Sequence, residues 1–361
     1  MESIDAARVL TPSGWLGPAR VSVEQGLIVA IEQVGSTAST RLLVPGFVDL
    51  QVNGIDDIDV ATADGDDWSR LDELLLRQGV TTWCPTLVTM PLDRFDRPLA
   101  RVEAAMQRPP ERRPTIAGAH LEGPFLGGAP GAHPPALIVP IDLGWLARLP
   151  AHVALVTLGA EQPDAARAAA LLVAAGRLVS VGHTLASEEQ FDGVVAAGAR
   201  LTTHLFNAMS GVHHRSPGVA TFALTNPQVS ASLIADGVHV HPRVLRLAFA
   251  ALGRHRAVLV TDAVAWRSGR VGGIGVQLRD GAPRLPDGTL AGSALTMDAA
   301  IRTCVAAGVE LADAVVAAST NPAALIGLHD RGAIEVGRRA DLVALDPALT
   351  IEQVWLAGEP I

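Results

Sequence analysis

The stretch VALVTLGAEQPDAARAAALLVAAGRLVSVGHTLASEEQFDGVVAAGARLTTHL, residues 153–205, decides the fold. Apolar runs at 153–158, 178–182 and 200–205 alternate in it with Ala-rich helical segments at 164–175 and 188–197. Parallel strands that are buried on both faces read as such continuous apolar runs. The alternation therefore predicts repeated strand–helix units.

The same pattern extends along most of the chain. The predicted strands are 42–52, 80–88, 115–121, 153–158, 178–182, 200–205, 229–235 and 257–261. The predicted helices are 68–78, 92–107, 164–175, 188–197, 242–252 and 297–307. Eight strands favour a closed (β/α)8 barrel of the TIM type over an open doubly wound sheet. No Gly-x-Gly-x-x-Gly fingerprint follows the first strand, which also disfavours a dinucleotide-binding fold.

Both ends of the chain read as short strands instead. The candidates are 19–24 and 26–32 near the N-terminus and 340–345 and 352–356 near the C-terminus. We therefore predict an α/β protein in which residues 46–335 form the barrel. Residues 1–45 and 336–361 are predicted to form a small β-sandwich domain built from both termini.

Composition excludes several classes of function. The net charge of -9 argues against a nucleic-acid partner, because binding phosphate backbones requires a broad basic surface. The longest apolar stretch, 168–176, is too short for a bilayer, which takes about 20 residues. Two cysteines indicate no disulfide framework, so we expect a cytoplasmic protein. All 28 basic residues are arginine, which excludes a Schiff-base lysine or a carbamylated lysine that bridges two metals.

Polar residues recur where the predicted strands end. They are Asp49, Gln51, Asn53, His120, Glu122, His183, His204, Asp236, His239 and Asp262. Catalytic groups of such barrels lie at the carboxyl ends of the strands. Glu122, His183 and His204 supply one carboxylate and two imidazoles, the ligand set of a hydrolytic metal with an open water position. Asp262 could accept a proton from that water and pass it to a leaving amine.

Several blocks of the sequence carry a resemblance to a known family. They are PGFVDLQVNG at 45–54, HLEGPF at 120–125, GHT at 182–184, THLFNAM at 203–209, RSPG at 215–218, ADGVH at 235–239, VTDA at 260–263 and LAGSA at 290–294. In these blocks the chain resembles the N-acetylglucosamine-6-phosphate deacetylase family of the amidohydrolase superfamily. The segments NPA at 321–323 and GRRADLV at 337–343 are shared more widely across the superfamily.

The resemblance implies roles for individual residues. Glu122, His183 and His204 would bind the metal, Asp262 would act as the catalytic acid and base, and His133 would polarise the acetyl carbonyl or line a mobile loop. The implied substrate pocket comprises Ala132, His133, Asn207, Ala208, Arg215, Asp236, Gly237, Val238, His239, Leu290, Ala291 and Gly292. Arg215 and His239 would bind the phosphate, with Arg215 reaching across the interface of a homodimer.

The first strand departs from most of the superfamily, which has His-x-His there to bind a second metal. Asp49-Leu50-Gln51 stands in its place, and a glutamine amide is a poor zinc ligand. We therefore expect one divalent ion per subunit, most simply Zn²⁺, with Fe²⁺, Mn²⁺ or Co²⁺ as alternatives. Gln51 would then hydrogen-bond the catalytic water and so take part in the substrate site.

The expected function is hydrolysis of the acetamide of an N-acetylhexosamine phosphate, N-acetylglucosamine-6-phosphate first. The galactosamine epimer is an alternative substrate that the sequence leaves open. A cyclic-amide hydrolase or a deaminase of the same fold would need the missing His-x-His. A non-catalytic sugar-phosphate sensor would have no use for a proton shuttle at Asp262.

Overall fold

The computed structural model describes residues 2–110 and 112–361. Eight parallel strands pair in sequence order around a ring. They are β7 (Phe47–Val52), β10 (Val80–Val88), β12 (Ala119–Glu122), β13 (Val153–Leu158), β14 (Leu178–Val181), β15 (Leu201–Thr202), β16 (Ser230–Leu233) and β17 (Ala257–Leu259). The segment after β17 closes the ring onto β7, because the Asp262 N–H donates to the Gln51 carbonyl over 2.9 Å. The predicted TIM-type barrel is confirmed.

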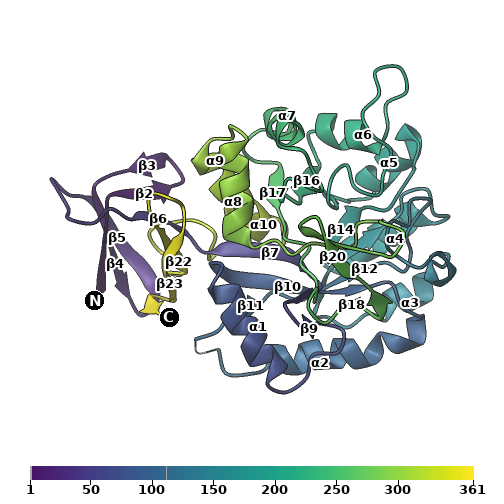
Figure 1. The fold of residues 1–361 in the computed structure, drawn as a ribbon, viewed down its shortest axis with the longest axis horizontal. Helices are drawn as coiled ribbons and strands as arrows, with labels where there is room; N and C mark the ends of the chain where they lie inside the picture. Colours follow the sequence, from purple (N-terminus) through teal and green to yellow (C-terminus); the bar gives the residue numbers. More distant parts are fainter. Residues whose placement is uncertain (1, 111) are drawn as a thin grey trace.

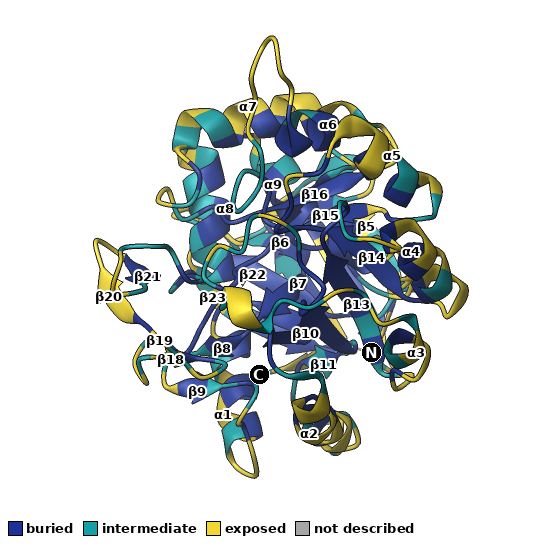
Figure 2. Ribbon diagram, turned by 90° about the vertical axis from the view of Figure 1, so that its right-hand side faces the viewer, coloured by how far each residue is buried: buried dark blue, intermediate teal, exposed yellow. Residues whose placement is uncertain are grey.

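Helices surround the barrel, as the end-on view of Figure 2 shows. They are α1 (Asp67–Leu76), α2 (Asp96–Met106), α3 (Leu143–Ala147), α4 (Ala165–Ala174), α5 (Glu188–Ala196), α6 (Val219–Thr225), α7 (Pro242–Leu252), α8 (Met297–Ala306), α9 (Leu311–Ala318) and α10 (Thr320–Leu325). Helix α4 illustrates why they pack inward, since it buries Ala165, Ala168, Ala169 and Leu172 at helical spacing. Ser187 begins α5 with a capping box.

A small lobe holds both ends of the chain, at the left of Figure 1. One sheet contains β1 (Glu2–Ala6), β4 (Ala19–Glu24) and β5 (Leu27–Gln33). The other has the order β24 (Glu359–Pro360), β23 (Ile351–Leu356), β22 (Leu342–Leu345), β6 (Leu42–Pro45), β2 (Arg8–Thr11) and β3 (Gly14–Leu16). A separate apolar core that includes Val21, Ile28, Leu43, Leu342 and Trp355 lies between them.

Two predicted strands are each divided by a glycine. The strand expected at 42–52 is wrong as one element, since β6 belongs to the small lobe and β7 to the barrel. Gly46 separates them at a point where a Cβ would lie 2.3 Å from the Thr81 hydroxyl oxygen. The strand expected at 115–121 likewise divides into β11 (Thr115–Ile116) and β12 at Gly118, whose φ is +142°. Both glycines allow a close backbone approach that a side chain would prevent.

The chain between β17 and α8 contains strands where no helix or strand was predicted from the sequence. It forms two small hairpins, β18 (Arg270–Val271) with β19 (Ile274–Gly275) and β20 (Gln277–Arg279) with β21 (Ala282–Arg284). We call residues 266–291 the hairpin segment. Other short elements are β8 (Gly54–Ile55), β9 (Ile58–Asp59), η1 (Leu92–Arg94) and η2 (Pro135–Leu137). Strands of two or three residues carry too little periodicity to be predicted.

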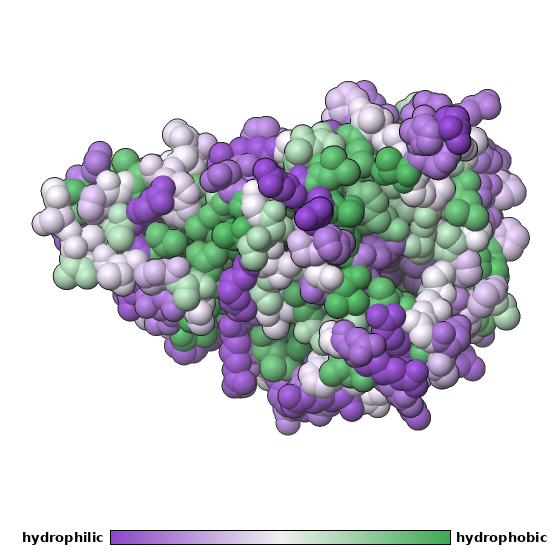
Figure 3. Space-filling view, turned by 45° about the horizontal axis from the view of Figure 1, so that its top comes forward, coloured by the Kyte–Doolittle hydropathy of each residue, from purple (hydrophilic) through white to green (hydrophobic). Residues whose placement is uncertain are grey.

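The outer surface mixes apolar and polar groups, and Figure 3 shows both at the margin of a hollow in the barrel half. Within residues 2–110 and 112–361, every helix is too short or too polar to cross a bilayer.

Candidate active site

Glu122, His183 and His204 meet at the carboxyl end of the barrel. Glu122 ends β12, His183 follows β14 and His204 follows β15. Glu122 Oε1 lies 3.3 Å from His183 Nε2 and 3.0 Å from His204 Nε2, and the two imidazole nitrogens are 3.1 Å apart. All three side chains are buried. Two imidazole nitrogens and one carboxylate oxygen therefore converge on a single point.

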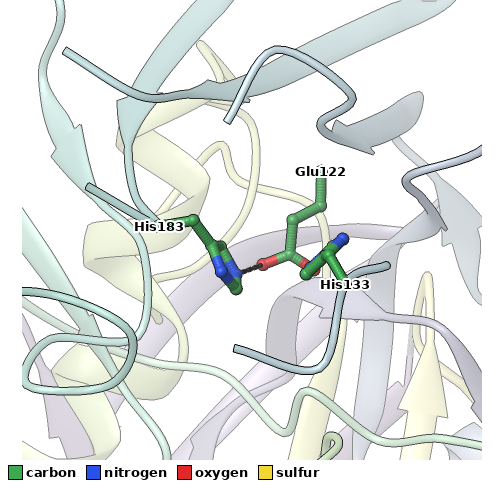
Figure 4. Close-up of side chains that lie close together, drawn as sticks. All are labelled: Glu122, His133 and His183. Atoms are coloured by element: carbon green, nitrogen blue, oxygen red, sulfur yellow. Dashed lines mark hydrogen bonds and ion pairs between the residues drawn. The ribbon is translucent and has the colours of Figure 1, made fainter. Parts of the chain in front are cut away.

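His133 approaches the same point from the loop after β12, as Figure 4 shows beside Glu122 and His183. One ligand atom each of Glu122, His133 and His183 can be chosen within 4.8 Å of one another, so this trio could also hold a metal. His133 Nε2 lies 3.7 Å from the second carboxylate oxygen of Glu122, whereas His204 lies within 3.1 Å of both other ligands. The tighter set is the predicted Glu122, His183 and His204, with His133 at its edge.

The backbone is strained where these side chains turn inward. His183, His204 and Asp262 have φ values of +50°, +31° and +49°. A non-glycine residue in this region costs about 1–3 kcal/mol and persists where the surrounding structure imposes it. Left-handed residues at the ends of β14, β15 and β17 turn the chain sharply at the barrel mouth, where their side chains line one cavity.

Glu122 and the nearby Asp262 have different electrostatic surroundings. Burial alone would raise the pKa of Glu122, but its hydrogen bonds to His183 and His204 hold that pKa well below its usual range. Burial, and then the negative charge of Glu122, raise the pKa of Asp262 to about 8. A carboxyl group with a pKa near neutrality is suited to exchange a proton during turnover.

Two amide side chains, one in β7 and one directly after it, hold Asp262. Asn53 donates to Asp262 Oδ1 over 2.7 Å, and Gln51 donates to the same oxygen over 3.1 Å. Gln51 also donates to Glu122 Oε1 over 2.9 Å. Its amide nitrogen thus bridges the carboxylates of Glu122 and Asp262. Asn53 lines the cavity but Gln51 lies behind these two carboxylates.

Sequence reasoning missed two residues that hold the loop carrying His133. Thr89, directly after β10, lies 2.8 Å from His133 Nδ1. Glu161, in the loop after β13, accepts hydrogen bonds from the Gly128 and Leu185 N–H groups, each over 2.7 Å, and from the Thr184 hydroxyl. The Glu161 carboxylate therefore joins the His133 loop to the turn that follows His183. Both residues follow a predicted strand directly or within three residues, which is the signal that could have revealed them.

A cavity of about 280 Å³ opens above Glu122, His183 and His204. Of the substrate residues predicted from the resemblance, it is lined by Ala132, His133, Asn207, Ala208, His239, Leu290, Ala291 and Gly292. Gln51, Arg215, Asp236, Gly237 and Val238 lie outside this lining. The cavity also contains aliphatic side chains that the sequence did not single out, among them Val88, Val264, Val271 and Ile274.

Asp236 acts on the cavity through His239. Asp236 Oδ2 lies 2.6 Å from His239 Nδ1, and Oδ1 accepts the backbone N–H groups of Val238 and His239. Burial would raise the pKa of Asp236, but the hydrogen bond and charge of His239 lower it. This pairing fixes the His239 ring and directs its other nitrogen away from Asp236.

Replacing Asp236 with Asn should raise the KM for the N-acetylhexosamine phosphate expected from the sequence about tenfold and change kcat less. The variant loses a charge-assisted hydrogen bond to His239, and bonds of this class contribute about 1.5–3 kcal/mol. Steady-state kinetics check this, with Asp313→Asn, which alters a half-buried carboxylate of α9 outside the cavity lining, as control. An unchanged KM would contradict the positioning of His239 by Asp236.

Asp49 and His120, two of the predicted strand-end residues, lie beneath the cavity and outside its lining. His120 contacts the Thr86 and Thr157 hydroxyls, and burial lowers its pKa to about 4. Asp49 accepts hydrogen bonds from the Thr261 hydroxyl over 2.6 Å and from the backbone N–H groups of Gln51 and Thr261. Asp49 therefore links the first and last strands of the barrel.

Burial raises the pKa of Asp49 from 3.8 to about 7, which makes the stability contribution of this residue depend on pH. The folded state binds more protons than the unfolded state between these values, so this contribution falls as the pH rises from about 4 to about 7. Replacing Asp49 with Asn removes the titration. Relative to wild type, the variant should gain about 3 kcal/mol in free energy of unfolding between pH 5 and pH 8. Urea titrations of both proteins at the two pH values check this, and a difference independent of pH would contradict it.

Arg215 lies on an exposed loop between β15 and α6 that projects from the barrel beside α6 (Figure 1). The His213 ring accepts backbone hydrogen bonds from Arg215 and Ser216 over 3.4 and 3.2 Å and so shapes the turn. Among the described residues that line the cavity there is no arginine. The described residues of the cavity wall therefore carry no permanent positive charge.

Comparisons with known proteins agree with this architecture. A model of the amidohydrolase family matches residues 42–361. The chain is 36% identical to the N-acetylgalactosamine-6-phosphate deacetylase of Escherichia coli O157:H7, over 98% of this chain and 97% of that protein. It is 37% identical to the N-acetylglucosamine-6-phosphate deacetylase of Danio rerio, over 89% of this chain and 84% of that one.

A solved structure resembles the whole molecule. It is a mutant of N-acetyl-D-glucosamine-6-phosphate deacetylase from Mycobacterium smegmatis, in complex with N-acetyl-D-glucosamine-6-phosphate. The TM-score is 0.92 at 33% identity, with 99% of this chain and 98% of that chain covered. The resemblance drawn from the sequence is thereby confirmed. The chain belongs to the amidohydrolase family, among its metal-dependent amino-sugar-phosphate deacetylases.

Proposed function

We propose that the protein hydrolyses the acetamide of N-acetylglucosamine-6-phosphate to glucosamine-6-phosphate and acetate. The observation that carries the proposal is the convergence of Glu122, His183 and His204 beside Asp262 in one cavity. The Mycobacterium smegmatis enzyme in complex with this substrate supports the choice of sugar.

The donor set fits one divalent metal ion. Tetrahedral ligands at about 2.0–2.2 Å from a zinc ion lie about 3.3–3.6 Å apart, near the 3.0–3.3 Å between these donor atoms. When bound, such an ion supplies Lewis acidity and lowers the pKa of water to about 7. Zn²⁺ is our first choice, and nitrogen and oxygen donors also suit Fe²⁺, Mn²⁺ or Co²⁺. Gln51 favours a single ion, because its N–H groups face the two carboxylates that a second cation would need.

Asp262 is the proposed acid and base. Asn53 and Gln51 both bond Oδ1, which leaves Oδ2 to receive a proton from the attacking water. The water oxygen adds to the acetyl carbon, and Asp262 then gives the proton to the nitrogen as the carbon–nitrogen bond breaks. His133 Nε2, 3.7 Å from Glu122 Oε2, would donate a hydrogen bond to the acetyl oxygen. A Thr89 hydroxyl that donates to His133 Nδ1 would keep the ring N–H on Nε2 for this purpose.

We propose a homodimer in which Arg215 enters the cavity of the neighbouring subunit. The substrate phosphate carries about two negative charges at neutral pH, by analogy with other phosphate esters. His239 and Asn207 are polar cavity residues without a permanent charge. Arg215 is exposed on a projecting loop, and its guanidinium group can donate two hydrogen bonds to phosphate oxygens.

We also propose that the enzyme works in the cytoplasm. Cys84 and Cys304 are free and buried, as is usual for proteins of a reducing compartment.

The test is release of free amine from N-acetylglucosamine-6-phosphate before and after chelation, alongside metal analysis. Chelator-sensitive turnover with one metal per chain is the expected result. A metal-loaded protein without turnover on any N-acetylhexosamine phosphate would refute the proposal.

N-acetylgalactosamine-6-phosphate is the second candidate substrate, favoured by the Escherichia coli relative that matches 98% of the chain. The same assay with the two epimers at equal concentration decides between them. A higher kcat/KM on the galactosamine compound would assign the enzyme to that epimer.

A further inference from the structure

The loop after β12 passes over His183 and contacts its ring. We call residues 127–129 the strap. The Gly127 N–H donates to the His183 carbonyl over 2.8 Å, and His183 Nδ1 lies 3.2 Å from the Ala129 carbonyl oxygen. Two residues further on, a Cβ on Gly131 would lie 3.3 Å from His183 Cε1. The backbone of this loop therefore lies against both the main chain and the ring of His183.

The contact with Ala129 determines which nitrogen of His183 carries the proton. A carbonyl oxygen can only accept, so Nδ1 is the donor. In the neutral imidazole this leaves the lone pair on Nε2, the nitrogen that lies 3.3 Å from Glu122 Oε1 and 3.1 Å from His204 Nε2. Partners of this kind fix the tautomer and the ring orientation of metal-binding histidines. His183 therefore depends on the strap to present its lone pair to the proposed metal.

Glu161, in the loop after β13, holds the strap. Its Oε1 accepts the N–H groups of Gly128 and Leu185, each over 2.7 Å, and its Oε2 accepts the Thr184 hydroxyl. A Cβ on Gly127 would collide with this carboxylate, so the strap lies directly against it. One side chain therefore joins the strap to the turn that follows β14.

The other imidazole, His204, differs in this respect. Its Nδ1 is buried and has no hydrogen-bond partner among residues 2–110 and 112–361. Of the two proposed histidine ligands, His183 is therefore the one whose ring is held through contacts that a substitution outside the cavity can change.

We propose that Glu161 is a positioning residue for the metal: by holding the strap, it keeps the Ala129 carbonyl on His183 Nδ1 and so strengthens the binding of the divalent ion. The inference rests on the proposed function, since it takes His183 as a ligand. Glu161 lies outside the cavity lining, so it acts through the strap and not on the substrate.

The affinity of the purified protein for zinc, measured by competition with a chromophoric chelator, tests this without any substrate. Glu161→Ala removes all three hydrogen bonds and should weaken zinc binding about 10–100-fold, as is usual when the partner behind a metal-binding histidine is lost. Glu161→Gln keeps the shape but loses at least one acceptor, so its loss should be about 2–10-fold. Wild-type affinity in Glu161→Ala would overturn the proposal, and if that variant does not fold, the same result in Glu161→Gln would.

Asp59→Ala is the matched control. Asp59 is also a half-buried carboxylate that joins two loops, since it accepts the N–H groups of Ala61 and Gly272 over 2.9 and 2.7 Å. Its variant should lose thermal stability and keep the zinc affinity of wild type. A loss of affinity equal to that of Glu161→Ala would overturn the proposal, because it would reflect general loosening of the loops and not the position of His183.

Wild type separates this inference from the proposed function. If wild type binds one zinc ion but hydrolyses no N-acetylhexosamine phosphate, the proposed function fails, and the affinities of the variants still decide the role of Glu161. If wild type binds no zinc, both are refuted.

Discussion

Replacing Asp262 with Asn should lower kcat about 10³-fold while KM stays within a few-fold of wild type, because proton transfer by a positioned side chain contributes 10²–10⁴-fold. Asparagine can still accept the hydrogen bonds of Asn53 and Gln51 through its carbonyl oxygen, so the local structure is retained. It cannot take a proton from water. Steady-state kinetics with metal-loaded protein give both constants.

Asp49→Asn is the matched control for this experiment. Asp49 is also a fully buried carboxylate of the barrel, on the adjoining strand, but it lies outside the cavity lining. Its variant should retain kcat within about threefold, since no proton of the reaction passes through it. A kcat for Asp262→Asn within tenfold of wild type would rule out the acid/base role, and equal losses in both variants would indicate damage to the barrel instead.

Replacing Glu122 with Gln should abolish metal binding and reduce turnover more than about 10³-fold. Its Oε1 is the atom that meets both imidazole nitrogens, and a neutral amide oxygen donates weakly to a divalent ion. The low pKa of Glu122 means that its carboxylate is fully ionised at neutral pH. Metal content after dialysis, measured by atomic emission, is the direct readout.

Two references make the Glu122 result interpretable. Wild type stripped of metal by a chelator should match the variant in thermal stability, because both lack the same ion. Glu103→Gln alters an exposed glutamate of α2 and should keep one metal per chain. A stoichiometric metal in Glu122→Gln would refute its assignment as a ligand.

The order of apolar and helical segments was sufficient to predict the barrel, because strands buried on both faces must be apolar throughout. It was also sufficient to select the ligand candidates. Residues just beyond parallel strands share one end of a barrel, so Glu122, His183 and His204 could be expected together without knowledge of any distance. The same rule also selected Asp49 and His120, which do not line the cavity. Position along a strand does not show which side chains extend beyond the packed interior of the barrel. These two side chains lie below the cavity and bond Thr261, Thr86 and Thr157 instead.

By itself, then, the sequence determined the fold class, the family and the set of competent side chains, because these depend on local pattern and residue type. Tertiary structure alone decided the rest. The predicted first strand is interrupted at Gly46, the hairpin segment packs against Val88, and hydrogen bonds to Glu161 join two loops. These features depend on contacts between segments far apart in the chain. Such contacts leave no periodic pattern in the sequence of either segment. For the same reason the aliphatic residues of the cavity lining, Val88, Val264 and Ile274, could be recognised only when β10, β17 and the hairpin segment lay together.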